Sequence, residues 1–100
     1  MRLTSHEIKA IKIIANKIFG QQTTVFLFGS RVDDMKKGGD IDLLIECLDK
    51  NKYTIENKVR FLAELKQEIG DQKIDVVFDS GITRNKKQFY NSIIKNKVVL

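Results

Sequence analysis

Proline and tryptophan are absent from this 100-residue sequence, and cysteine and histidine occur once each. The single cysteine, Cys47, excludes an internal disulfide, and its position near Ile45 in an expected strand predicts a buried, unreactive thiol. The single histidine, His6, has no cysteine or second histidine near it, so we expect a solvated side chain and not a metal ligand. Neither residue predicts a functional site.

Long apolar runs are also absent. No stretch approaches the roughly 18–20 apolar residues that a membrane-spanning helix requires. The N-terminus begins with a charged, periodic segment and has neither a signal-peptide core nor a small-residue cleavage site. We therefore expect a cytoplasmic protein without a membrane partner. The length is that of one small domain, and residues 1–100 contain no repeat or linker that would divide it.

The formal net charge of +5 raises the question of nucleic-acid binding. The lysines are scattered along the chain, and only Lys36–Lys37 and Lys86–Lys87 are adjacent pairs. Neither pair is interleaved with the aromatic residues of a base-stacking surface. We interpret the lysines as solvated faces that also attract an anionic nucleotide or an acidic partner. Nucleic acid is not expected as the main partner.

Three segments have the apolar periodicity of helices: Thr4–Phe19, Tyr53 or Thr54 to Ile69, and about Thr83 to Lys95. The first begins with a Thr-x-x-Glu capping box, and glycines follow the first two segments as stop signals. In the second helix, one apolar face is expected to be buried, with Phe61 at its border. That face consists of Ile55, Val59, Leu62, Leu65 and Ile69. In the last helix, Phe89 and Ile93 are expected to point inward.

Three further segments predict β-strands: Val25–Phe28, Asp40–Glu46 and Lys73–Phe78. The first is apolar throughout, as in strands covered on both faces. The second alternates, with Ile41, Leu43 and Ile45 on one face and Asp40, Asp42, Leu44 and Glu46 on the other. Between these two strands, Arg31–Lys37 is expected to form a short helix that Gly38–Gly39 ends.

The order of the elements predicts an α+β fold, with a small mixed sheet of about three strands packed with helices. The connection between the first two strands is too short for an ordinary parallel crossover, so those strands are not expected to be a parallel pair. The apolar tail Val98–Leu100 would pack on the core or pair as an edge strand.

Asp40, Asp42 and Asp75 are the candidate metal ligands. Asp40 and Asp42 are two residues apart on a strand, so both carboxylates project from one face, about 6–7 Å apart at Cα. If Asp75 on the third strand lies level with Asp42, three carboxylates converge. Such like charges raise each other's pKa, and Mg²⁺ bound together with phosphate oxygens would offset them. The alternative is that each is a solvated strand-end residue, with Asp75 paired to Lys73.

Gly29-Ser30-Arg31 is the candidate phosphate-binding turn. Glycine allows the backbone to approach a phosphate closely, serine offers a hydroxyl, and arginine offers a charge-assisted donor. A Gly-Ser pair alone is a weak signal, as is Asp-x-Asp alone. Together the three segments favour a site for a metal-bound triphosphate. Two Mg²⁺ ions about 3.5–4 Å apart would stabilise the attacking and leaving oxygens of a phosphoryl displacement.

The run F-G-S-R-x8-D-I-D-L-L-I, followed by I-D-V-V-F, resembles the nucleotidyltransferase superfamily of DNA polymerase β. It is similar in particular to the small minimal nucleotidyltransferase (MNT) proteins that are paired with HEPN-domain proteins in prokaryotic toxin–antitoxin modules. The resemblance implies a polymerase β-like core, Gly29 and Ser30 at the triphosphate, Asp40 and Asp42 as Mg²⁺ ligands, and Asp75 near the acceptor hydroxyl. Gly39 stands where many relatives have serine, which removes a hydroxyl but no ligand.

The resemblance also implies an activity. The expected reaction is Mg²⁺-dependent transfer of AMP from ATP to a hydroxyl of a HEPN-type partner, which would neutralise a toxic RNase. The chain is too short to hold its own acceptor-binding domain, which favours a protein acceptor or an obligate partner. Two alternatives remain: an antitoxin that masks its partner without catalysis, and the catalytic half of a two-chain enzyme that modifies a small-molecule hydroxyl, as on an antibiotic. The sequence leaves homo-oligomerisation and the preferred base open.

Overall fold

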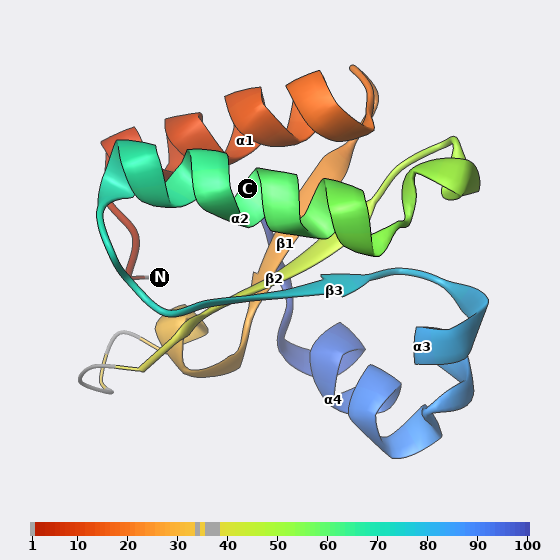
Figure 1. Ribbon diagram of the computed structural model, residues 1–100. Helices are drawn as coiled ribbons and strands as arrows, with labels where there is room; N and C mark the ends of the chain where they lie inside the picture. The colour runs from red at the N-terminus through yellow and green to blue at the C-terminus, as the bar shows by residue number, and fades with distance from the viewer. Residues whose placement is uncertain (1, 34, 36–38) are drawn as a thin grey trace.

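The structure is a computed structural model that describes residues 2–33, 35 and 39–100 (Figure 1). In these residues, helices pack on both faces of a four-stranded sheet. The elements are α1 (Ser5–Phe19), β1 (Thr24–Phe28), β2 (Ile41–Glu46), α2 (Ile55–Ile69), β3 (Ile74–Phe78), α3 (Gly81–Asn85), α4 (Lys87–Asn96) and β4 (Val98–Val99). Short 3₁₀ turns at Gly29–Val32 and Lys50–Lys52 lie in the connections.

The sheet has the strand order β3-β2-β1-β4. β1 is antiparallel to both β2 and β4, whereas β2 and β3 are parallel and are joined through α2. The expected mixed sheet and α+β class are therefore confirmed. The C-terminal tail adds a fourth strand, because Val98 and Val99 pair with Leu27 and Phe26 of β1.

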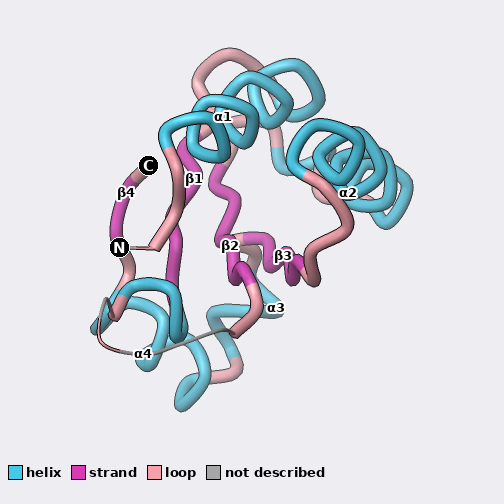
Figure 2. Tube along the Cα trace, turned by 90° about the vertical axis from the view of Figure 1, so that its left-hand side faces the viewer, coloured by secondary structure: helices cyan, strands magenta, loops and turns pink. Residues whose placement is uncertain are grey.

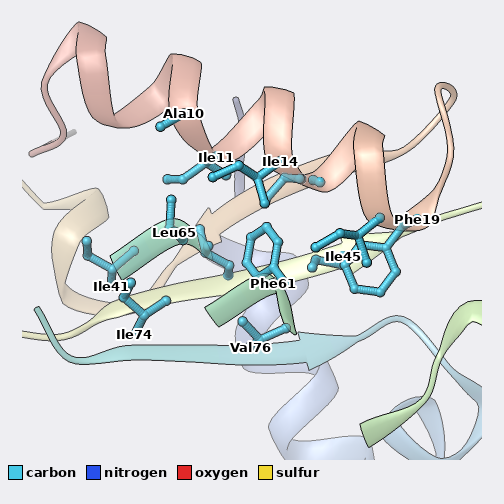
Figure 3. Packing of buried hydrophobic residues seen from close by; sticks show 14 of the residues in the cluster. Ala10, Ile11, Ile14, Phe19, Ile41, Ile45, Phe61, Leu65, Ile74 and Val76 are labelled. Carbon is cyan, nitrogen blue, oxygen red and sulfur yellow. The ribbon is translucent and has the colours of Figure 1, made fainter. Parts of the chain in front are cut away.

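Helices α1 and α2 lie side by side on one face of the sheet, and α3 and α4 lie on the other (Figures 1 and 2). The main core forms beneath α1 and α2, where the inward residues of both helices meet alternate residues of the strands (Figure 3). Phe19 and Phe61 are both buried there, with their ring centroids 5.9 Å apart. Cys47 joins this core as a buried thiol, as the sequence predicts.

Both long helices begin with side-chain caps, and the cap of α1 is the predicted one. The Thr4 hydroxyl accepts a hydrogen bond from the Glu7 amide at 3.0 Å, and the Glu7 carboxylate accepts one from the Thr4 amide at 2.8 Å. This is the expected capping box. The side chain of Thr54 caps α2 by accepting from the Asn57 amide. No helix in the described part of the chain is long and apolar enough to span a membrane.

The buried face of α2 agrees with the expected one at Leu65 and, in part, at Leu62 and Ile69, but differs in the first half of the helix. Ile55 and Val59 are 79% and 58% exposed, whereas Phe61, placed at the border by its spacing, is fully buried. The apolar residues of this helix are compatible with two neighbouring stripes. The structure buries the stripe of Phe61 and Leu65, because these side chains fill the space between α1 and the sheet.

Two expected helices also differ from the structure. The last helix is divided in two, because Lys86 has the non-helical angles φ −83° and ψ 74°. Its first part begins earlier than expected, where the Ser80 side chain accepts from the Thr83 amide. The helix expected over Arg31–Lys37 is replaced by the 3₁₀ turn, which ends at Val32; residues 34 and 36–38 lie outside the described part.

Leu44 belongs to a second, smaller core. It shares a face of β2 with Asp42, but it is fully buried against Phe28 and against Ile93 of α4. Helix α4 therefore covers only part of this face. The sheet's second face is apolar under α4 and acidic toward the start of β2 and β3.

Candidate active site

Asp42 and Asp75 are register partners on the parallel strands β2 and β3. Register partners on adjacent strands project from the same face, with their backbones about 4.8 Å apart. The condition set by the sequence analysis, that Asp75 lies level with Asp42, is therefore met. The two carboxylates come together because α2 returns the chain to β3 alongside β2.

The proximity of the other aspartates changes the acidity of Asp42. Burial, together with the negative charges of Asp75 and Asp40, raises the pKa of the Asp42 carboxyl to about 6. The ammonium of Lys73 opposes this effect and lowers the pKa. Near neutral pH the pair is therefore a concentration of negative charge that a cation would stabilise.

Asp40 is turned toward a different partner. Its Oδ2 atom lies 3.4 Å from Nζ of Lys73. Among the described residues, no three histidine, cysteine, aspartate or glutamate side chains form a group arranged to hold a metal ion. The expected convergence of three carboxylates is therefore not preformed. Asp42 and Asp75 lie together, and Asp40 is paired with Lys73 close enough for both charges to act on Asp42.

Gly29 lies directly against the Asp42 carboxylate. Its φ of +77° is in the left-handed region that favours glycine, and a Cβ built on it would overlap Oδ2 of Asp42. The backbone of the Gly29–Val32 turn thus contacts one of the two paired carboxylates. The expected phosphate turn and the expected metal ligands are adjacent in space.

Ser30 and Gly39 make a second close approach in the same loop. Gly39 has a φ of +94°, and a Cβ there would overlap the Ser30 hydroxyl oxygen. The guanidinium of Arg2 donates to the Ser30 carbonyl at 3.0 Å. Glycine at position 39, where the resemblance leads one to expect serine, is therefore consistent with the local packing in this chain.

Arg31 supports the turn. Its Nη1 atom donates to the Arg2 carbonyl at 2.9 Å, its Nε atom to the Gly39 carbonyl at 3.3 Å, and its Nη2 atom to Oε1 of Gln72 at 3.2 Å. All three nitrogens thus have protein acceptors. These hydrogen bonds hold the loop in place, and the phosphate contact of Arg31 stays a prediction.

A cleft of about 530 Å³ opens beside the Asp42–Asp75 pair. Lys58 and Leu62 of α2 line one side, and Phe89 of α4 lines the other. Lys58 was not among the predicted site residues. The signal that could have identified it is its helical spacing, three and seven residues before Phe61 and Leu65, which places it on the helix face that packs toward the sheet.

The comparison with known families agrees with this geometry. The family model described as polymerase beta, nucleotidyltransferase, matches residues 9–100. The chain therefore belongs to this nucleotidyltransferase family, and nucleotidyl transfer is its general activity. The matched range contains the turn and all three aspartates. No individual curated protein matches the chain at a significant level.

The donor atoms fit the divalent cation that such enzymes typically use with a nucleoside triphosphate. Carboxylate oxygens are the ligands that Mg²⁺ prefers. Without a cation, the crowded pair retains a proton up to about pH 6, as the pKa of Asp42 indicates. A bound cation would take the place of that proton and remove the repulsion between the carboxylates.

Proposed function

We propose that this protein transfers a nucleoside monophosphate, AMP from ATP, to a hydroxyl of a HEPN-type partner protein and thereby acts as its antitoxin. The observation that carries the proposal is the register pairing of Asp42 with Asp75 beside an open cleft, in a member of the nucleotidyltransferase family. The cleft supports a macromolecular acceptor, because it continues into apolar surface that includes Phe89, which is 42% exposed.

Each site residue has a proposed role. Asp42 and Asp75 would hold Mg²⁺ with the triphosphate, and Asp40 would join them on release from Lys73. The backbone of Gly29 and the hydroxyl of Ser30 would bind the phosphates that leave as pyrophosphate. Arg31 would keep this turn in place through its three hydrogen-bonded nitrogens. When bound, Mg²⁺ would neutralise negative charge that develops on the phosphates.

The reaction is a single displacement at phosphorus. The acceptor hydroxyl oxygen forms a bond to the α-phosphorus, and the bond from that phosphorus to the oxygen bridging to the β-phosphate breaks. Pyrophosphate leaves, and the hydroxyl proton passes to the Asp75 carboxylate. Asp75 suits this part because it is solvent-exposed, whereas Asp42 is partly covered by the turn.

The test is incubation of the protein with α-labelled ATP, Mg²⁺ and the purified product of the neighbouring gene. We expect label on that partner, loss of its RNase activity, and no label with Asp42→Asn. Neutralisation that persists in the Asp40→Asn, Asp42→Asn double variant would replace the proposal with non-catalytic masking. Label that reaches only a small-molecule hydroxyl would replace it with a two-chain small-molecule transferase.

A further inference from the structure

β3 has a free edge beside the active-site pair. It stands at one end of the strand order β3-β2-β1-β4, and no strand of the described residues pairs with its outer side. Figure 1 shows β3 at the front of the sheet, with α2 above it and α3 and α4 below. Unpaired strand edges are templates for another chain, and proteins usually block them. This edge also carries Asp75, which is exposed.

The pairing with β2 determines which backbone groups face outward. The Ile41 amide donates to the Lys73 carbonyl at 3.0 Å, and the Asp79 amide donates to the Ile45 carbonyl at 2.9 Å. Facing residues alternate in a parallel ladder, so positions 73, 75, 77 and 79 bond to β2. The amide and the carbonyl of both Ile74 and Val76 therefore point to the open edge, away from β2. Phe78 directs its amide there, while its carbonyl accepts from Ser80.

The space outside this edge is hollowed along its length. A second hollow of about 410 Å³ adjoins the cleft and shares Lys58, Val76, Val77 and Phe89 with it. It continues past the end of β3 to Ile82 of α3, which is 75% exposed. A groove thus extends along β3 from Asp75 to α3, and its apolar lining includes Val77, Ile82 and Phe89.

The charges of the groove are divided along its length. Asp42 and Asp75 lie at the active-site end, whereas the charged residues of the described chain that line the rest are Lys58 of α2 and Lys86 at the junction of α3 and α4. The whole chain is basic, with a formal net charge of +5. An extended segment with carboxylates would be attracted to this groove. A second copy of the chain carries the same net charge of +5, so net charge disfavours it as the occupant.

We propose that the free edge of β3 binds an extended, acidic segment of the acceptor protein as an added strand. Such a segment bonds to the outward backbone groups of Ile74, Val76 and Phe78, and its alternate side chains lie on the face of the sheet that carries Asp75. A serine, threonine or tyrosine opposite Asp75 then has its hydroxyl beside the carboxylate pair. The edge thus selects an acceptor segment that is extended and acidic. That the bound segment is the acceptor of the transfer reaction rests on the proposed function.

The probe for this site is a displayed library of twelve-residue peptides with a fixed central tyrosine, selected against the whole protein. We expect the binders to be acidic, and their binding to shift the backbone amide resonances of Ile74, Val76 and Phe78. The best binder is then made in two forms, each N-methylated at every second residue, so that each form lacks the amide donors of one edge of the extended peptide. The form methylated on the edge that faces β3 should bind about tenfold or more weakly, because its hydrogen bonds to β3 are lost. The other form should bind normally.

A matched pair of surface variants separates the groove from the rest of the surface. Ile82→Glu introduces a negative charge beside the groove and should weaken peptide binding about tenfold. Ile13→Glu changes an isoleucine of α1 that is 58% exposed and lies away from the groove, so binding should be unchanged. Neither residue lies in the cleft beside Asp42, so both variants should still be stabilised by Mg²⁺ and ATP.

Three peptide results would overturn the inference: no enriched peptide, resonance shifts that avoid β3, or equal binding of both N-methylated forms. A dimer in sedimentation whose interface is the edge of β3 would also overturn it. These results do not depend on catalysis. If the peptide binds β3 but the protein binds no Mg²⁺–ATP, the proposed function fails and the docking edge stands without an acceptor role. If Mg²⁺–ATP binds and no peptide does, only the docking edge fails.

Discussion

The backbone of Gly29 lies so close to the Asp42 carboxylate that a Cβ on residue 29 would overlap its Oδ2 atom, and the carboxylate would have to move. Gly29 begins the turn proposed to bind phosphate, and Asp42 belongs to the pair proposed to bind the metal. Their contact means that any phosphate at the turn lies next to any cation on the carboxylates. A metal-bound triphosphate is the ligand that satisfies both subsites at once.

Gly29→Ala should therefore damage both stability and nucleotide binding. The matched control is Gly70→Ala, because Gly70 also has a positive φ, +94°, but a Cβ there would meet no atom within 4 Å. The control should cost about 1–3 kcal/mol of backbone strain. Gly29→Ala should cost more in urea unfolding and should also lose the stabilisation by Mg²⁺ and ATP. Equal behaviour of the two variants would contradict the close contact.

Asp42→Asn should stabilise the metal-free protein at pH 7. The pKa of Asp42 is about 6 in the folded state and 3.8 in its ordinary state. Between these values the folded protein holds a proton that the unfolded chain releases, so stability falls as pH rises through this window. The variant lacks this loss and should have the higher Tm above pH 6, with little difference below about pH 4. A lower Tm of the variant at pH 7 without metal would contradict the repulsion.

Lys73→Gln should strengthen Mg²⁺ binding. The substitution frees Asp40 from its ion pair and removes a positive charge that competes with the cation. In thermal-shift titrations, the Mg²⁺ concentration for half-maximal stabilisation should fall about two- to fivefold. Lys66→Gln, on the exposed surface of α2, is the control and should leave it unchanged. Weaker Mg²⁺ binding by the Lys73 variant would show that Lys73 assists the site.

Asp79→Asn should destabilise the junction between β3 and α3. The Asp79 side chain is only 1% exposed and forms a bidentate pair with Arg84, with N–O distances of 2.8 and 3.0 Å. The hydrogen bonds from Arg84 hold the pKa of Asp79 below its usual range, so its contribution is present above pH 4 and is lost on acidification. We expect a loss of about 1–3 kcal/mol at pH 7 in urea unfolding.

The control for Asp79 is Glu64→Gln. Glu64 also pairs with a cation, Lys17 at 2.6 Å, but this pair lies at the surface of α1 and α2, where solvent screens it. The variant should change stability much less than Asp79→Asn. An equal loss in the two variants would mean that burial is not what makes the Asp79 pair important.

The part of the fold that the sequence predicts best is the part with local signals. The capping box at Thr4 and the alternation of β2 are decided within a few residues, and both are present. The buried stripe of α2 was predicted correctly in its second half, at Leu65, and wrongly in its first half. Ile55 and Phe61 are equally apolar, and only tertiary packing selects between them. The break at Lys86 has no local signal such as glycine or proline in the sequence, so the pattern predicted one continuous helix.

The site shows the same division. The pattern of the strands predicts that Asp75 and Asp42 lie on the polar face of their strands, but the register that makes them partners is known only from the folded sheet. The contacts of Arg31 and Asp40 could not be predicted, because their partners Arg2, Gln72 and Lys73 are close only in the folded chain. Long charged side chains choose among several partners, and tertiary structure determines which of them is near.

The most direct test of the central claim is calorimetric binding of ATP, with and without Mg²⁺, to the wild type, Asp42→Asn and Asp75→Asn. We predict that Mg²⁺ strengthens ATP binding to the wild type and that each substitution removes this gain without unfolding the protein. Mg²⁺-dependent ATP binding of unchanged strength in both variants would contradict the assignment of the Asp42–Asp75 pair as the metal–nucleotide site.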